Sequence, residues 1–121
     1  MSLDNAQYLS LSTRKRDGSR VETPVWFAQQ QSVIFIFSEG DAGKIKRIRN
    51  FADVKLSPCT VTGKITGESI NGTAKILTDA KDIQKAHQAL VKKYGWQMRL
   101  LDMGSALVGK KKKRAFVRID L

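Results

Sequence analysis

The sequence is short of the residues that build metal sites and disulfides. It has one cysteine, Cys59, and one histidine, His87, in 121 residues. A single cysteine forms no disulfide within the chain, which fits a reducing compartment such as the cytoplasm. One cysteine and one histidine are also too few soft ligands for a structural zinc site. The sequence therefore predicts a cytoplasmic protein without a metal.

Long apolar segments and linkers are also missing. The longest apolar run, residues 33–37, has only the length of a strand, whereas a membrane-spanning helix needs roughly 20 apolar residues. The first four residues, Met-Ser-Leu-Asp, form neither a basic segment nor an apolar stretch, so no signal peptide is expected. No internal repeat and no Pro- or Ser-rich linker interrupts the chain. We therefore expect a single domain over residues 1–121, with no membrane contact.

Acidic residues are few relative to basic ones. The chain has 11 Asp and Glu against 22 Lys and Arg, a net charge of +11 and a pI near 10.1. Such an excess favours an anionic partner, and nucleic acid, acidic lipid headgroups and a phosphorylated cofactor all qualify. Composition does not choose among the three, so the choice depends on where the cations lie along the chain.

Alternating and β-branched segments predict six strands. Residues 8–13 alternate apolar and polar side chains, and Asp17-Gly18 is a hairpin turn signal. Residues 33–38 are apolar without alternation, so this strand needs cover on both faces, which we expect from a second subunit or a bound ring. The six expected strands cover residues 8–13, 20–27, 33–38, 54–61, 69–77 and 114–121.

Two segments have helical spacing instead. Residues 44–51 place Ile45 and Ile48 on one face. Residues 79–94 have Thr78 or Asp79 as a natural N-cap and Gly95 as a stop. Six strands with two helices predict an α+β, mainly β domain built on an antiparallel barrel.

Cations gather where the first helix is expected to begin. They are Lys44, Lys46, Arg47 and Arg49. A helix start normally favours acidic residues, because its free N–H groups carry partial positive charge. The pattern is explained if an anion such as a phosphate binds there. A solvated basic face, with Glu39 and Asp41 just upstream, is the alternative.

Two neighbouring strands are rich in aromatic and apolar residues. Residues 23–27 (Thr-Pro-Val-Trp-Phe) and residues 36–38 (Ile-Phe-Ser) could form the floor for a planar ring. For any one of Trp26, Phe27, Ile36 and Phe37, ordinary core packing is the favoured alternative.

In order and spacing, these segments resemble the pyridoxamine 5′-phosphate oxidase-like flavin-binding split barrels. The resemblance is strongest to the small branch described as deazaflavin (coenzyme F420)-dependent enzymes. It covers nearly the whole chain, up to the last strand. The segments that carry it are residues 9–13, the turn at residues 16–18, and residues 23–27, 43–49, 54–59 and 92–95.

The resemblance implies a six-stranded split β-barrel, a homodimer and two flavin sites at the subunit interface. It implies that Lys44, supported by Lys46 and Arg49, binds the phosphate of FMN or coenzyme F420. The residues expected along the cofactor ring are Thr23, Pro24 and Val25 on one strand and Phe37 and Ser38 on the next. The larger oxidases have an Arg-Lys pair where this chain has Gly43-Lys44, and a C-terminal segment for pyridoxal phosphate that this chain lacks. True pyridoxamine phosphate oxidase activity is therefore not expected.

Other features take simpler interpretations. His87 is expected to be a surface or capping histidine rather than an acid–base group or haem ligand, and Cys59 an inert buried thiol. Residues 110–114 form a cationic run without interleaved aromatics, which is a poor pattern for binding nucleic acid. They are interpreted as a solvated turn, with contact to the oligoglutamate tail of coenzyme F420 as a sharper hypothesis.

We therefore expect an oxidoreductase that transfers a hydride between FMN or coenzyme F420 and a small-molecule acceptor. No Ser-His-Asp set or carboxylate pair stands out, and none is needed, because the cofactor ring carries the chemistry. A non-catalytic flavin carrier or sensor is the alternative, and a nucleic-acid-binding module is a third class that we do not expect.

Overall fold

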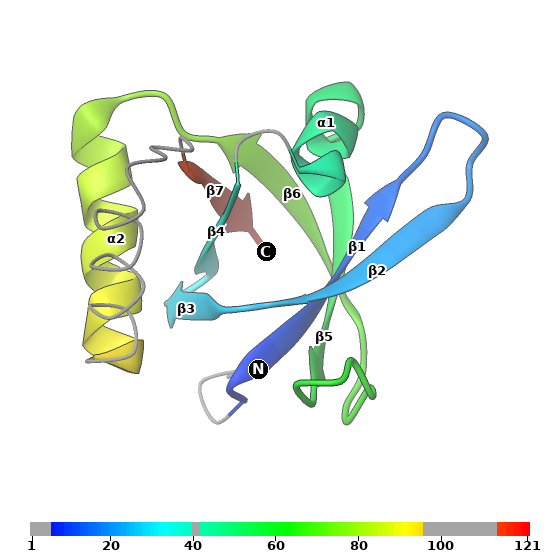
Figure 1. Cartoon of the computed structure of the whole chain (residues 1–121), viewed down its shortest axis with the longest axis horizontal. Helices are drawn as coiled ribbons and strands as arrows, with labels where there is room; N and C mark the ends of the chain where they lie inside the picture. The colour runs from blue at the N-terminus through cyan, green and yellow to red at the C-terminus, as the bar shows by residue number, and fades with distance from the viewer. Residues whose placement is uncertain (1–5, 40–41, 96–113) are drawn as a thin grey trace.

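The residues that the structure describes form one antiparallel sheet rolled into a barrel, with two helices (Figure 1). A computed structural model describes residues 6–39, 42–95 and 114–121. Its elements are β1 (Tyr8–Arg14), β2 (Arg20–Val25), β3 (Phe27–Gln30), β4 (Val33–Glu39), α1 (Gly43–Asn50), β5 (Asp53–Cys59), β6 (Ile70–Ile76), α2 (Ala80–Tyr94) and β7 (Arg114–Asp120). The prediction of a mainly β barrel with two helices is confirmed.

The number of strands differs from the prediction. The sheet has seven strands in the order β2-β1-β5-β6-β7-β4-β3. The segment expected to be one strand over residues 20–27 divides at Trp26, because Val25 pairs with Leu9 of β1 whereas Phe27 pairs with Ile36 of β4. β2 and β3 thus lie at opposite ends of the strand order while adjoining in sequence. This connection brings the two ends of the sheet together and closes the barrel.

The inner faces of the strands form the main core. Alternate residues along each strand point inward, as the two-residue period of a strand requires. Leu9 and Leu11 of β1, for example, are fully buried there. α1 lies across one end of the barrel and contributes Ile45 and Ile48 to the same core. The burial of these two isoleucines fixes α1, so the helix turns its polar side chains away from the barrel.

A second core lies between α2 and the outer face of β3, β4 and β7. Phe35 is only 3% exposed and packs with Ala86 and Leu90 of α2. The expectation that a second subunit or a bound ring covers the outer face of β4 is therefore wrong. The helix that follows β6 returns across this face, and its apolar stripe supplies the cover within one chain.

Candidate functional site

The candidate site begins at the N-terminus of α1. The helix starts after Ala42, which offers no side-chain cap, and its first turn contains no acidic residue. Lys44 is half-buried, while Lys46 and Arg49 are exposed. The positive end of the helix dipole and several cations therefore coincide at this end of the helix, which is the arrangement that binds anions.

Arg47 is fixed beside this helix start. Its Nε donates a hydrogen bond to Thr13 Oγ1 at 2.7 Å, and Thr13 is almost fully buried. A Cβ on Gly43 would lie 2.8 Å from a terminal nitrogen of Arg47. The guanidinium thus occupies the space that a side chain at position 43 would need. The sequence analysis counted Arg47 among the cations of the helix start but not among the phosphate ligands, although the glycine just before Lys44 was the signal that this space is open.

Three of the residues predicted to lie along the cofactor ring are on β2. They divide between the inner and the outer face of this strand. Val25 is buried in the barrel core, and Thr23, two residues before it, lies half-buried on the same inner side opposite Leu11. Pro24 pairs with Ser10 and is exposed on the outer side. Only Thr23 and Val25 therefore share the face that α1 closes.

The two predicted residues of β4 divide in the same way. Ser38 is 8% exposed and follows the inward-facing Ile34 and Ile36 at a spacing of two. Phe37 lies on the outer face, where its ring centroid is 6.3 Å from that of Trp26 and 6.2 Å from that of Phe116. The structure thus places Ser38 with Thr23 and Val25 on the inner side, and Phe37 with the aromatic residues near α2.

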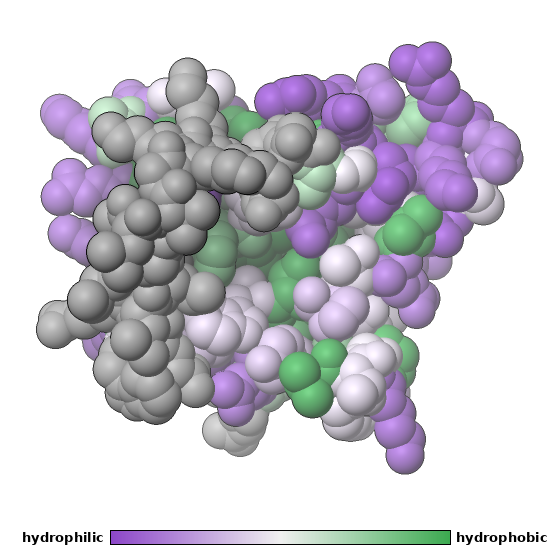
Figure 2. Space-filling model, in the orientation of Figure 1, coloured by the Kyte–Doolittle hydropathy of each residue, from purple (hydrophilic) through white to green (hydrophobic). Residues whose placement is uncertain are grey.

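Core packing explains part of the expected ring floor. Phe27 and Ile36 are fully buried in the barrel core. Trp26 is half-buried and stacks on Tyr94, with ring centroids 4.5 Å apart and planes 12° apart. Figure 2 nevertheless shows apolar side chains in the middle of the drawn face, below α1 and beside β2. The face next to the cationic helix start therefore offers apolar surface as well as charge.

The remaining candidates have ordinary surroundings. Cys59 is buried, and this burial raises the pKa of its thiol. The His87 ring lies edge-on to Phe116, with centroids 6.1 Å apart. Residues 110–113 of the cationic run lie outside the described residues, whereas Arg114 lies 5.5 Å from the centre of the Phe37 ring.

The described residues show neither a membrane-spanning helix nor a cluster of metal ligands. Residues 6–39, 42–95 and 114–121 contain no helix with the length and apolar character needed to cross a membrane. In the same ranges, no three His, Cys, Asp or Glu side chains lie close enough together to bind a metal ion.

Solved structures share the fold, although neither a protein-family model nor a curated protein matches the sequence. HutZ, the heme storage protein of Vibrio cholerae, is 11% identical with a TM-score of 0.72, over 98% of this chain and 83% of that one. An FAD-binding protein of Mesorhizobium loti is 16% identical with a TM-score of 0.68, over 98% and 82%. A candidate pyridoxamine 5′-phosphate oxidase of Listeria innocua is 14% identical with a TM-score of 0.65, over 97% and 85%.

These similarities establish the class of fold. The chain has the split-barrel fold of the pyridoxamine 5′-phosphate oxidase-like proteins. Among the similar structures, one is described as binding FAD and another as storing heme. At such low identities the ligand of one protein does not transfer to another, so the ligand must be argued from the residues of this chain.

Proposed function

We propose that this protein binds a flavin-type cofactor, FMN or coenzyme F420, and acts as an oxidoreductase on a small-molecule acceptor. The cofactor lies between two copies of the chain in a homodimer. The start of α1 binds its phosphate, and the predicted ring residues that share the inner side of the barrel, Thr23, Val25 and Ser38, lie beside its ring. The bound ring supplies the hydride chemistry.

The uncapped, cationic start of α1 carries the proposal. The N-cap residue, Ala42, makes no side-chain hydrogen bond to the first turn, and the positive end of the helix dipole attracts a phosphate. Lys44 adds a cation in the first turn, with Lys46 and Arg49 in support. This is the chemistry by which proteins bind the phosphate of a nucleotide.

Arg47 gives this site a second fixed cation. In the larger oxidases that the sequence resembles, an arginine precedes the helix lysine, and here that position is Gly43. The Arg47 guanidinium fills the space beside Gly43 and is held by Thr13. We propose that Arg47 replaces the missing arginine from one turn further along the helix.

A cofactor titration with a lysine variant tests this function. We expect Lys44→Ala to weaken binding of the preferred cofactor by about 2 kcal/mol, or roughly thirtyfold, as for one lost charged hydrogen bond. FMN and coenzyme F420 are titrated side by side, with quenching of cofactor fluorescence as the signal. Lys92→Ala is the matched control, because Lys92 is exposed in the last turn of α2. Equal dissociation constants for wild type and Lys44→Ala would place the phosphate elsewhere.

Two further measurements separate an enzyme from a carrier. Turnover of the reduced cofactor with an acceptor is expected for an oxidoreductase, whereas tight binding without turnover indicates a carrier or sensor. Light scattering of the protein with and without cofactor reports the expected dimer. A monomer that binds the cofactor at full affinity would contradict a site between two subunits.

A further inference from the structure

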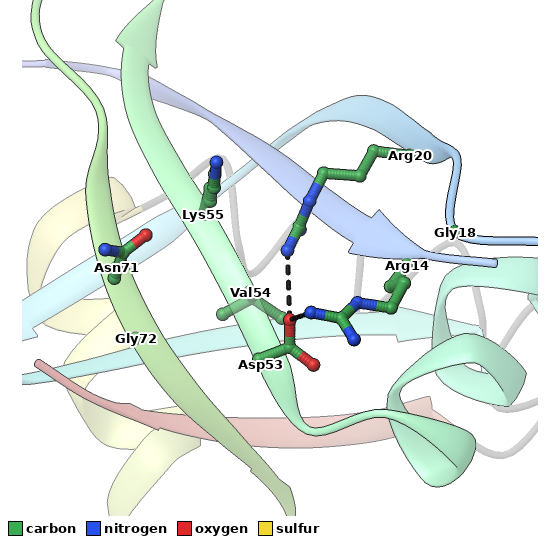
Figure 3. A pocket seen from close by; sticks show the side chains of 8 residues that line it. All are labelled: Arg14, Gly18, Arg20, Asp53, Val54, Lys55, Asn71 and Gly72. Carbon is green, nitrogen blue, oxygen red and sulfur yellow. Dashed lines mark hydrogen bonds and ion pairs between the residues drawn. The ribbon is translucent and has the colours of Figure 1, made fainter. Parts of the chain in front are cut away.

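A separate cleft opens on the outer face of the sheet, beside the β1–β2 hairpin (Figure 3). Its volume is about 610 Å³, within the range of about 300–1,000 Å³ typical of small-molecule sites. Arg14 and Arg20 reach it from the two strands of the hairpin, and Lys55 and Asn71 from β5 and β6. We propose that this cleft binds a small phosphorylated molecule through its phosphate group. The site is independent of the proposed flavin site.

The charge of the lining favours an anion. Three of the eight lining residues are cations, and Asp53 is the one carboxylate among the eight. Asp53 accepts from both arginines through the same oxygen, Oδ2, at 2.6 Å from Arg14 and 3.0 Å from Arg20. The lining thus carries three positive side chains and one carboxylate, which leaves a net charge of about +2 to attract a phosphate dianion.

The two arginines are also held in place without a ligand. Arg20 donates to the backbone oxygen of Ser12 at 3.2 Å in addition to Asp53. The Arg14 guanidinium lies 5.6 Å from the centre of the Phe51 ring. Side chains that are already ordered lose less conformational entropy when they bind. Because each guanidinium has five N–H donors, donors remain for a phosphate after these contacts.

Lys55 and Asn71 complete the polar wall. Both are exposed, neighbour each other across the β5–β6 pair and, within the described part of the chain, form no ion pair. The alternative is that the cleft serves only stability. Ion pairing within the fold would then explain why Arg14, Arg20 and Asp53 lie together, but it would not explain the presence of Lys55 and Asn71. The lining has no aromatic side chain on which a base could stack. These features favour a small phosphorylated molecule over a nucleic acid.

This cleft and the cofactor site lie at opposite ends of α1. Asp53 follows the helix C-terminus, where Phe51 is the C-cap, whereas Lys44 lies in the first turn. An eight-residue helix is about 12 Å long, so one phosphate cannot contact both ends. A substitution at one end of α1 therefore tests only the site at that end.

Calorimetric titration with inorganic pyrophosphate at low ionic strength tests the proposal. We expect the Arg14→Gln/Lys55→Ser double variant to bind at least about tenfold more weakly than wild type, since charged hydrogen bonds are lost. Lys81→Ser/Lys92→Ser is the control, because it removes the same charge from exposed positions on α2. Lys44→Ala should retain this binding. Lys55→Ser alone, which breaks no ion pair within the described chain, keeps the test valid if the double variant does not fold.

Backbone amide shifts locate the bound anion. We expect pyrophosphate to move the amide signals of Lys55, Asn71 and Gly72 together. Affinity unchanged in both cleft variants, or lost equally in the lysine control, would overturn the proposal. A single-stranded oligonucleotide that binds more tightly than pyrophosphate, and depends on Arg14 and Lys55, would also overturn it in favour of a nucleic-acid surface.

Discussion

The hydroxyl of Tyr94 joins α2 to the barrel by hydrogen bonds, and its removal should lower the stability of the protein. Tyr94 lies in the last turn of α2 and is 6% exposed. Its hydroxyl accepts a hydrogen bond from the backbone N–H of Phe27 at 2.8 Å. The hydroxyl proton is within reach of two backbone oxygens, Gln7 O at 2.8 Å and Phe27 O at 3.0 Å. Phe27 begins β3, so this contact fixes the point where the two ends of the sheet meet.

Tyr94→Phe should keep the ring stacked on Trp26 and remove only these hydrogen bonds. The Phe27 N–H is then left without a partner in a buried place, which costs about 1–3 kcal/mol. We expect the free energy of unfolding, measured by urea titration, to fall by about 2 kcal/mol. Tyr8→Phe is the control, because Tyr8 is half-buried and its hydroxyl makes no hydrogen bond within the described chain. That variant should change stability by less than about 0.5 kcal/mol.

The same residue predicts a pH dependence. Burial raises the pKa of the Tyr94 hydroxyl to about 12, whereas the unfolded chain titrates near 10. Below pH 10 both states keep the proton, so stability is unaffected. As pH rises from about 10 to 12 the unfolded state loses the proton first, and wild type loses up to about 1.4 kcal/mol per pH unit more than Tyr94→Phe. Equal stability of the two proteins at pH 7, together with equal slopes above pH 10, would refute this account of how α2 is attached.

Two other substitutions test the packing of the sheet and the start of α2. Gly72→Ala should destabilise the protein by about 1–3 kcal/mol, because the new Cβ would lie 2.6 Å from Cγ2 of the fully buried Ile119; urea titration measures this, with the exposed Thr73→Ala as control. Asp79→Ala should cost about 1 kcal/mol, because the Asp79 side chain accepts from the Lys81 N–H at 2.8 Å. Thermal unfolding checks this second change, and Asp79→Asn, which retains a capping oxygen, should stay close to wild type.

Local signals predicted most of the fold. The turn at Asp17-Gly18 and the helix stop at Gly95 lie where the sequence indicated, because each depends on contacts within a few residues. Of the two N-cap candidates, Thr78 and Asp79, the structure uses Asp79. The seventh strand was missed for the opposite reason. Residues 20–27 are continuously strand-like, and only the pairing of Val25 with Leu9 and of Phe27 with Ile36 divides them.

The cover on β4 shows the same limit. The apolar run at residues 33–37 correctly indicated a strand buried on two faces, but not what covers it. α2 lies far along the sequence, and no local pattern indicates which strand it crosses. The same limit applies to the predicted site residues. A strand directs neighbouring side chains to opposite faces, so residues that are adjacent in sequence do not share one site. Phe37 and Ser38 are adjacent in sequence, yet one belongs to the aromatic cluster and the other to the inner side of the barrel.

Repulsion between the cations of α1 is small compared with the hydrophobic burial that holds the helix in place. Like charges three or four residues apart on a helix cost about 0.2–0.5 kcal/mol per pair, whereas burial of Ile45 and Ile48 contributes about 1.5–3 kcal/mol each. Hydrophobic burial alone therefore keeps the helix folded, and the accumulation of charge does not by itself require a ligand. The position of Arg47 is more informative, since a solvated lysine or arginine needs no fixed partner. Its hydrogen bond to the buried Thr13 holds a guanidinium against Gly43 at the helix start, where the positive end of the helix dipole already favours an anion.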